Sequence, residues 1–414
     1  MSENLGVRLI ELIKSLSLGM DLISSAVSNH HVRVGFLAAR LSHQLGYSAE
    51  VQRDLLFAGL MHDAGALSYR SRLDALEFET DGIVHCEAGY RLVRPYPRFY
   101  SVAQYIRHHH DKYADIKDKN NFTLECGNVV NLADRIDVQI KRDVPSAGQL
   151  ERIRQKIIEK KGIMFNPLHV EAFCDLSVQP GFADQLDNPQ DNLFTLAPEH
   201  LENEELSHNE LLEYTRLFSK IIDYRSSFTA THSRGVAEIA GTLTCLMDSP
   251  SIKCDYMRIA GNLHDLGKLA VPESILEKNG PLKDEEWTVM RSHPKYCRKI
   301  LSAVQGFTNI TEWACNHHER IDGKGYPFGL TGADLSLDCQ VLAVADVFTA
   351  ITEDRPYRDG MPMDIARAVL KDMSGSAFSS DVVDLLLDNY EDLNSIRKVA
   401  QSNARKEFFD LYEA

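Results

Sequence analysis

The sequence lacks the long apolar runs and the N-terminal signals that mark membrane and exported proteins. No stretch approaches the roughly 18 consecutive apolar residues that a membrane-spanning helix needs. The opening residues, MSENLGVRLIELIKSL, show neither the basic start nor the small-residue cleavage site of a signal peptide. We therefore expect a cytoplasmic protein that makes no use of a membrane.

Paired cysteines and excess positive charge are also missing. The eight cysteines are scattered singly, with no CxxC pair, so we expect reduced and mostly buried thiols in a chain without an export signal. The formal net charge of −15 argues against a DNA or RNA duplex as a partner. A phosphate-bearing ligand would have to be held by local cations or metals.

Strand-like alternation is scarce, whereas helical spacing of apolar residues runs through most of the chain, as in ELLEYTRLFSKIIDYRSSF and RGVAEIAGTLTCL. We therefore predict an all-α protein. A length of 414 residues suggests more than one domain. The acidic stretch between Asp184 and Ser207 contains two prolines and loses clear periodicity, which is typical of a connection. We expect one helical domain at 1–184, a connection at 185–206 and a second domain at 207–414.

Histidines recur in the same order in both halves. A spacing of 32 residues separates His30 from His62, and also His232 from His264. A spacing of 24 residues separates His85 from the pair that starts at His109, and also His293 from the pair that starts at His317. Each half ends the series with an Ala-Asp pair in an apolar helix, NLADRIDV and LAVADVFTAI. Duplication of one helical domain explains this register.

The repeated residues of the second half are chemically suited to bind metal. A lone buried histidine is usually a core residue, but several imidazoles and carboxylates converging from different helices suit first-row transition metals. The set exceeds what one ion needs, and a carboxylate can bridge two ions, so we predict a dinuclear site that lowers the pKa of a bridging water. Its members are His232, His264, Asp265, His293, His317, His318 and Asp346.

The same segments resemble a known family. HDLGKLAVP from 264, HP at 293, HHERIDGKGYP from 317 and ADVFTAITEDRPYR from 345 are similar to the motifs of the HD-GYP family, a branch of the HD-superfamily phosphohydrolases. The resemblance implies an all-α, metal-dependent phosphodiesterase that linearises a bacterial cyclic dinucleotide, either cyclic di-GMP or the mixed 3′,3′-cyclic GMP-AMP ring. It also implies that the segment DGKGYP at residues 322–327, which we name the GYP loop, meets partner domains that make cyclic dinucleotides.

The resemblance further implies roles for single residues. Two divalent ions, iron or manganese with nickel and zinc also open, would be held by His232, His264, Asp265 and Asp346 on one side and by Asp265, His293, His317 and His318 on the other. Asp265 and Lys268 would be catalytic, with Lys268 stabilising charge on the scissile phosphate. Substrate contacts would come from Lys268, Arg320, Asp322, Gly323, Gly325, Tyr326, Arg355 and Arg358. Arginine suits such contacts because its planar fork donates two parallel hydrogen bonds.

One position departs from the pattern. Some family members carry an acidic residue one turn before the first histidine, where it helps to hold a third metal, but this chain has Phe228 there. We therefore expect two metals and, as the main product, the linear dinucleotide.

The first half keeps the ligand types and loses other parts of the motif. Ala66 stands where Lys268 stands in the second copy, HHDKYAD replaces HHERIDGKGYP, and no RPYR follows. Three interpretations stay open: an inactive metal-binding domain that regulates or dimerises, a second hydrolase with another substrate, or a packing relic without metal. The possible second metal site comprises His30, His62, Asp63, His85, His109, His110 and Asp134.

Other functions also stay open for the whole chain. A non-catalytic scaffold could bind a cyclic dinucleotide without turnover, an HD hydrolase could act on another nucleotide, and a di-iron pair could activate oxygen. Retention of Lys268 and of the GYP loop favours the phosphodiesterase. A homodimer is a further expectation.

Overall fold

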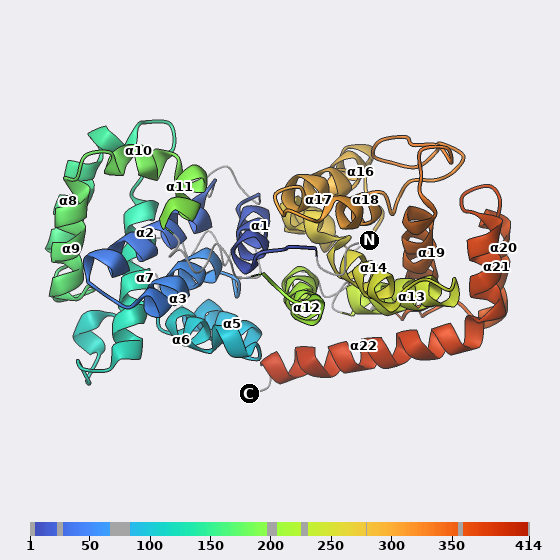
Figure 1. The fold of residues 1–414 in the computed structure, drawn as a ribbon, viewed down its shortest axis with the longest axis horizontal. Helices are drawn as coiled ribbons and strands as arrows, with labels where there is room; N and C mark the ends of the chain where they lie inside the picture. The colour runs from blue at the N-terminus through green and yellow to red at the C-terminus, as the bar shows by residue number, and fades with distance from the viewer. Residues whose placement is uncertain are drawn as a thin grey trace. The chain divides into compact units, whose positions relative to one another are not determined.

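The computed structural model describes residues 5–22, 28–66, 83–196, 205–224, 231–278, 280–354 and 359–412. Within these ranges the regular elements are helices, apart from isolated β-bridges, which confirms the expected all-α fold (Figure 1). None of the helices in the described ranges is both long and apolar enough to cross a membrane.

The chain forms two compact units. The N-terminal unit spans Arg8–Glu204, and the C-terminal unit comprises Glu205–Ala414 together with Met1–Val7. Within the C-terminal unit, the backbone amide of Leu206 donates to the carbonyl oxygen of Val7 at 2.8 Å, which anchors the first described residues there. The boundary between the units falls in the stretch 185–206, which the sequence presents as a connection.

Part of that expected connection is helical. α10 (Phe182–Asp187) runs into it, and α11 (Pro189–Leu196) begins on a proline, which is well tolerated in the first turn of a helix. α11 packs against α2 of the N-terminal unit. The described end of the N-terminal unit therefore reaches residue 196, beyond the expected limit at 184.

The two units repeat one order of helices. The N-terminal unit contains α1 (Leu9–Asp21), α2 (His30–Gln44), α3 (Ala49–Met61), α5 (Ile83–Val93), α6 (Tyr100–Arg107), α7 (Phe122–Val138), α8 (Leu150–Glu159) and α9 (Pro167–Ser177), with 3-10 turns at Pro97–Phe99, Tyr113–Asp115 and Ser146–Gly148. The C-terminal unit contains α12 (His208–Tyr224), α13 (His232–Leu246), α14 (Ser251–Leu263), the 3-10 helix η5 (Leu266–Ala270), α15 (Glu273–Leu276), α16 (Asp284–Met290), α17 (His293–Leu301), α18 (Thr308–Cys315), α19 (Leu337–Thr352), α20 (Met363–Met373), α21 (Ser380–Asp388) and α22 (Tyr390–Tyr412).

A close helix pair sets up each site. α13 and α14 pack side by side, and a Cβ added to Gly261 would lie 2.5 Å from the Cα of Ala237. α2 and α3 pack in the same way, with an added Cβ on Gly59 lying 2.6 Å from the Cα of Gly35. Because the two helices of a pair run antiparallel, the histidine that begins the first helix lies near the His-Asp pair that follows the second.

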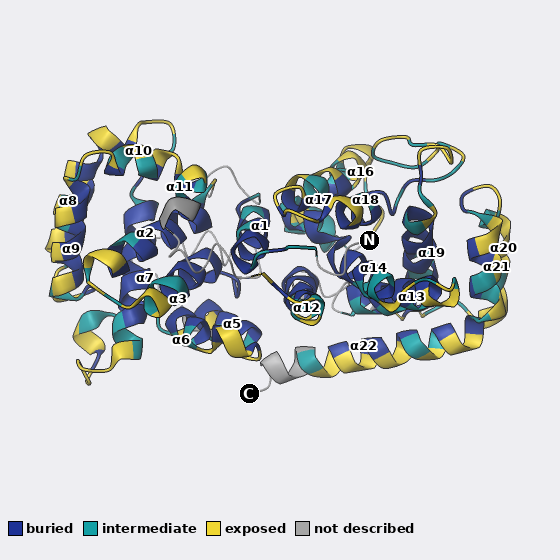
Figure 2. Ribbon diagram, viewed as in Figure 1, coloured by how far each residue is buried: buried dark blue, intermediate teal, exposed yellow. Residues whose placement is uncertain are grey.

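Five helices that carry or directly precede predicted ligands are largely buried. α2, α7, α13, α14 and α19 are largely buried, whereas α8, α9 and α20 expose one face (Figure 2). The middle of α19, VLAVADVF, is apolar except for Asp346, so Asp346 is a carboxylate on a core helix. Such a charge is costly to bury without a partner, which indicates that Asp346 has a dedicated role.

The expectation of eight reduced cysteines is wrong for one pair. Cys245, at the end of α13, and Cys254, in α14, form a disulfide with their Cα atoms 5.5 Å apart. The tight turn between the antiparallel helices brings residues nine positions apart to face each other. The other six cysteines are free thiols, and all of them except Cys174 are buried, as expected.

Candidate active site

The first group of predicted ligands joins three helices of the C-terminal unit. His232 begins α13, His264 caps the end of α14, and Asp346 lies within α19. The Nε2 atom of His232 lies 3.0 Å from Oδ1 of Asp346. One ligand atom from each of the three residues lies within 4.8 Å of the others, so a single ion could be held by all three.

The second group is formed by histidines that follow or begin other helices. His293 begins α17, and the adjacent His317 and His318 follow α18. The Nε2 atoms of His293 and His317 lie 3.4 Å apart, and the three residues again offer ligand atoms within 4.8 Å of one another.

Asp265 lies between these groups. Its Oδ2 atom is 3.3 Å from Nε2 of His264, and its Oδ1 atom is 3.4 Å from Nε2 of His293. One carboxylate therefore presents an oxygen to each group, which is the arrangement a bridging ligand requires. We name the six residues of the two groups, together with Asp265, the C-terminal cluster.

A glycine allows this approach. A Cβ added to Gly267 in η5 would lie 1.8 Å from the carbonyl oxygen of His293, so the His-Asp turn can meet the start of α17 only without a side chain there. Gly65 plays the same part against His85 in the N-terminal unit, where the distance would be 2.2 Å. This glycine is not among the residues predicted from the sequence, although its recurrence in both halves was a signal.

The outer ring nitrogens are held by the backbone. Nδ1 of His264 donates to the carbonyl of Gly261 at 2.7 Å, and Nδ1 of His317 donates to that of Ala314 at 2.6 Å. Nδ1 of His293 likewise bonds the carbonyl of Met290 at 2.8 Å. Each bond reaches back three residues and leaves Nε2 directed into the cluster, as in many metal-binding histidines.

His232 is held by a carboxylate instead. Its Nδ1 atom lies 3.1 Å and 3.2 Å from the two carboxylate oxygens of Glu353, which is buried and also accepts a hydrogen bond from Nε2 of Gln401 at 2.8 Å. Glu353 was not predicted from the sequence. In the first half, Asp137 plays the corresponding part by holding His30. Asp137 follows Asp134 by three residues, whereas Glu353 follows Asp346 by seven. Because the two spacings differ, comparison of the two halves does not reveal this pair of carboxylates.

The charges in the cluster favour bound cations. Burial would lower the pKa of His232, but the carboxylates of Glu353 and Asp346 outweigh it and raise the pKa to about 10. Burial would raise the pKa of Asp265, but His264 and Lys268 hold it well below its ordinary range. Burial lowers the pKa of His293 to about 3 and that of His318 to about 4, which leaves their lone pairs available at neutral pH.

The donor set fits transition-metal ions. Nε2 of His264 and Oδ1 of Asp265 are buried and have no hydrogen-bond partner among the described residues. Buried polar atoms are rarely left this way. Imidazoles combined with carboxylates, converging from separate helices, suit iron, manganese, zinc or nickel better than calcium or magnesium.

Lys268 lies next to the carboxylate of Asp265. Its Nζ atom is 2.6 Å from Oδ2 of Asp265, and its side chain is 18% exposed. The ammonium group of Lys268 thus contacts the cluster, while part of its side chain is open to solvent. It could contact a phosphate bound at the edge of the cluster.

The GYP loop is fixed against the cluster by a buried carboxylate. Glu319 accepts from the backbone amides of Phe328 at 2.6 Å and Leu330 at 3.0 Å. A Cβ on Gly325 would lie 2.5 Å from Cα of Glu319, so only glycine permits this path. The ring centroid of Tyr326 lies 4.6 Å from that of His318, which places its aromatic face at the edge of the cluster.

The remaining predicted substrate residues differ in placement. Arg320 and Asp322 form an ion pair at 2.7 Å within the exposed loop, and Gly323 has a positive φ of 72°. Arg355 and Arg358 lie outside the described residues, as does Phe228.

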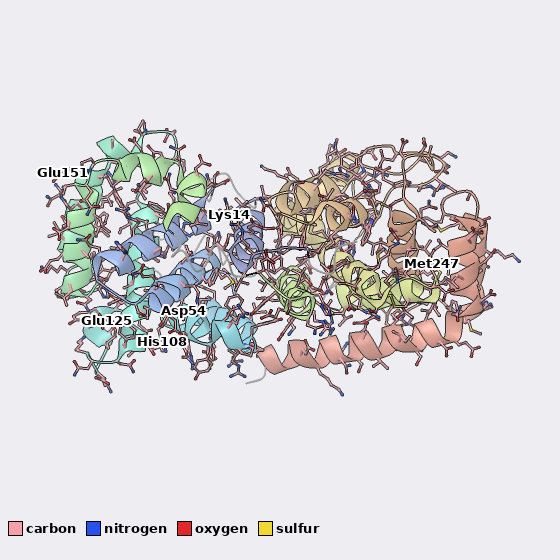
Figure 3. All side chains as sticks on the ribbon, viewed as in Figure 1. Lys14, Asp54, His108, Glu125, Glu151 and Met247 are labelled. Atoms are coloured by element: carbon pink, nitrogen blue, oxygen red, sulfur yellow. A yellow bond between two sulfur atoms is a disulfide. The ribbon has the colours of Figure 1, made fainter. Side chains whose placement is uncertain are left out.

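The N-terminal unit also assembles its predicted residues. Nε2 of His30 lies 3.6 Å from Oδ1 of Asp134, and Nε2 of His85 lies 3.4 Å from Oδ1 of Asp63. Three successive histidines follow α6. His109 and His110 join this cluster. His108, which is labelled in Figure 3, instead pairs with Asp111 at 2.7 Å. His62 also belongs to this set. We name the set the N-terminal cluster; its members are His30, His62, Asp63, His85, His109, His110 and Asp134.

Comparisons with known proteins agree with this description. A family model described as an HD domain matches residues 216–382, and another HD-domain model matches residues 27–139. The chain is 30% identical to 3′3′-cGAMP-specific phosphodiesterase 1 of Vibrio cholerae over 90% of this chain and 88% of that protein. It is 33% identical to the cyclic di-GMP phosphodiesterase response regulator RpfG of Xanthomonas campestris over 59% of this chain and 66% of that protein.

A solved structure has the same fold. The crystal structure of a cyclic GMP-AMP specific phosphodiesterase of Vibrio cholerae, V-cGAP3, superposes with a TM-score of 0.65 at 24% identity and covers 93% of this chain and 98% of that one. Family membership follows from three findings: the two HD domains, the GYP loop, and the similarity over most of the chain to a phosphodiesterase. The chain belongs to the HD-GYP family, with two HD domains in tandem.

Proposed function

We propose that this chain is a metal-dependent phosphodiesterase that opens a 3′,5′-phosphodiester of a bacterial cyclic dinucleotide. We assign the reaction to the domain at 207–414. The observation that carries the proposal is the position of Asp265, which presents one oxygen to each of two histidine groups and also contacts Lys268.

The cluster would hold two divalent transition-metal ions, with iron or manganese expected first. One ion would be bound by His232, His264 and Asp346 and the other by His293, His317 and His318, with Asp265 shared. Such ions polarise a phosphoryl oxygen and make a hydroxide nucleophile available near neutral pH.

The chain's own residues would bind and orient the substrate. The Lys268 ammonium, 2.6 Å from Oδ2 of Asp265, would stabilise the charge that develops on the phosphate oxygens. Tyr326 would offer its ring to a base, because it lies at the edge of the cluster beside His318. Glu319 would keep the loop in place through its two backbone contacts.

The relatives suggest the order in which substrates should be tried. The 3′3′-cGAMP-specific phosphodiesterases 1 and 3 of Vibrio cholerae match over 90% and 93% of this chain, whereas the RpfG match covers 59%. We therefore propose 3′,3′-cyclic GMP-AMP as the first substrate and cyclic di-GMP as the second. The linear dinucleotide is the expected main product.

The test is hydrolysis by the full chain loaded with manganese or ferrous iron. Both cyclic dinucleotides are incubated with the wild type, with Asp265→Ala, and with His208→Ala as a control histidine outside the cluster, with a side chain 41% exposed. We expect linear product from the wild type and the control and none from Asp265→Ala. Binding of cyclic dinucleotide without product from the wild type would overturn the proposal in favour of a scaffold.

A further inference from the structure

We propose that the N-terminal cluster is a second transition-metal centre of different chemistry, in which a thiolate from Cys86 and an additional imidazole from His31 take part. Neither residue belongs to the pattern that the two halves share. The centre would bind metal without the group that contacts phosphate in the C-terminal unit.

Cys86 lies among three histidines. His85, Cys86, His109 and His110 offer ligand atoms that all lie within 4.8 Å of one another. Nε2 of His85 is 3.3 Å from Nε2 of His109, and Sγ of Cys86 is 3.9 Å and 4.0 Å from these two nitrogens.

These separations are close to those of a tetrahedral site. Two nitrogens bound about 2.05 Å from one tetrahedral ion lie about 3.3 Å apart, and a nitrogen and a sulfur lie about 3.6 Å apart. The observed nitrogen pair matches the first value, and the sulfur needs to move by only a few tenths of an ångström. Cys86 is 3% exposed, so the thiol faces the cluster and not solvent.

His31 lies near one carboxylate oxygen of Asp63, whereas His85 lies near the other. The Nε2 atom of His31 lies 4.0 Å from Oδ2 of Asp63, and its ring centroid is 5.3 Å from that of His62. Its Nδ1 atom is held by Asp21 at 2.5 Å, in the way that His30 is held by Asp137 at 2.6 Å. Both rings therefore turn Nε2 inward.

Several of the atoms that point into the cluster have no hydrogen-bond partner in the described part of the chain. Nε2 of His30, His31, His62 and His110 and Oδ1 of Asp63 are buried without a hydrogen-bond partner among the described residues. So many unpaired polar atoms in one interior place are unusual in a folded protein. Metal ions would satisfy all of them.

Three of the differences between the two clusters bear on metal and phosphate binding. Ser233 occupies the position that corresponds to His31, and Pro294 the position that corresponds to Cys86. Ala66 occupies the position of Lys268. The N-terminal cluster has thus gained two donors and lost the lysine, which favours metal retention over phosphate chemistry.

The orienting contacts that the two clusters share argue against a packing relic without metal in the first half. Nδ1 of His62 donates to the carbonyl of Gly59 at 2.9 Å and Nδ1 of His109 to that of Ile106 at 2.6 Å, as in the C-terminal cluster. The aspartate that holds His31, Asp21, also has a counterpart in the C-terminal unit. There Asp223 accepts a hydrogen bond at 2.9 Å from Ser233, which occupies the position of His31. A relic without a ligand would have no reason to keep these orienting contacts.

Arg135 brings one positive charge to this cluster and bonds one of the two carboxylate oxygens of Asp134. Its guanidinium bonds Oδ2 of Asp134 at 2.5 Å. Oδ1 of Asp134 faces Nε2 of His30 at 3.6 Å and Nε2 of His62 at 3.9 Å and stays available to a metal.

The donor types define the class of metal. Thiolate and imidazole together favour zinc, ferrous iron or cobalt(II) and disfavour magnesium and calcium. Cobalt(II) is the best probe, because a cobalt–thiolate bond gives a charge-transfer absorption that imidazole and carboxylate ligands do not.

The test uses the full chain with the C-terminal cluster disabled by His264→Ala and Asp265→Ala. We expect this variant to retain zinc or cobalt after gel filtration and to show the thiolate charge-transfer band. Adding Cys86→Ser should remove the band, whereas Cys126→Ser, at a buried cysteine on α7 in contact with Tyr105, should leave it unchanged. His31→Ser, which copies the C-terminal residue, should weaken cobalt binding about 10- to 100-fold.

The readout does not depend on activity, so it separates this proposal from the hydrolysis proposed above. If Cys86→Ser fails to fold, X-ray absorption at the zinc edge of the disabled chain gives the answer, because a sulfur neighbour should appear at about 2.3 Å. Absence of retained metal, or a band that Cys86→Ser leaves intact, or a zinc shell with only nitrogen and oxygen, would overturn the proposal.

Discussion

Replacing Glu353 by glutamine tests whether the carboxylate behind His232 matters for the metal site. Glu353 is buried and receives two donors, Nδ1 of His232 at 3.1 Å and Nε2 of Gln401 at 2.8 Å. A glutamine has one acceptor oxygen, so its amide group would face one of these donors. The ring of His232 would lose the charge that orients it.

The magnitude follows from the kind of bond. A hydrogen bond to a charged group contributes about 1.5–3 kcal/mol, which corresponds to about 10- to 100-fold in an equilibrium constant. We therefore expect Glu353→Gln to weaken manganese binding by this factor and to reduce turnover at limiting metal. Glu391→Gln, at the exposed start of α22, is the matched control.

A relocated carboxylate should restore what is lost. Thr349 corresponds to Asp137, because each follows the cluster aspartate of its unit by three residues, and its buried Oγ1 has no hydrogen-bond partner among the described residues. Thr349→Asp should therefore recover part of the metal affinity of Glu353→Ala, as measured by isothermal titration of the metal-free chain. Unchanged manganese affinity in Glu353→Gln would refute the reasoning.

Three further changes test other parts of the account. Lys268→Ala should lower kcat about 100- to 1,000-fold while metal content by elemental analysis stays the same; loss of metal as well would show that Lys268 is structural. Gly267→Ala should abolish metal binding by the C-terminal cluster in a chain that still has helical circular dichroism, because its Cβ would lie 1.8 Å from the carbonyl of His293; a C-terminal cluster with its full metal content would contradict this. Burial raises the pKa of Asp223 to about 7 from an ordinary 3.8, so the folded chain holds a proton there that the unfolded chain releases between these pH values. The stability of the wild type relative to Asp223→Asn should therefore fall by up to about 1.4 kcal/mol per pH unit as the pH rises from about 4 to about 7, and then level off; equal slopes in urea titrations of both proteins would exclude it.

The repeat made most of the fold and of the two clusters predictable. The spacing of 32 residues from His232 to His264, repeated from His30 to His62, indicated a duplicated domain, and the structure shows that each spacing spans two antiparallel helices and one turn. The His-Asp pair and the Ala-Asp pair are short enough to be recognised from single motifs.

The contacts that differ between the halves were not predictable in this way. Comparing the halves draws attention to what they share, and His31 has no histidine opposite it. Cys86 was indistinguishable from a core thiol, because only the fold shows that it faces His109. Glu353 and Asp137 each hold Nδ1 of the first histidine of their cluster, but from positions that do not correspond in the two halves. The disulfide between Cys245 and Cys254 depends on how two helices face each other, which their separation of nine residues does not specify.

The central proposal is that Asp265 would bridge two metal ions, each held by one of the two ligand groups of the C-terminal cluster. An anomalous-scattering map from crystals of the full chain grown with manganese tests it most directly. We predict two peaks in the C-terminal unit, one against His232, His264 and Asp346 and the other against His293, His317 and His318, with an oxygen of Asp265 next to each. A single peak away from Asp265, or none among these side chains, would contradict the account.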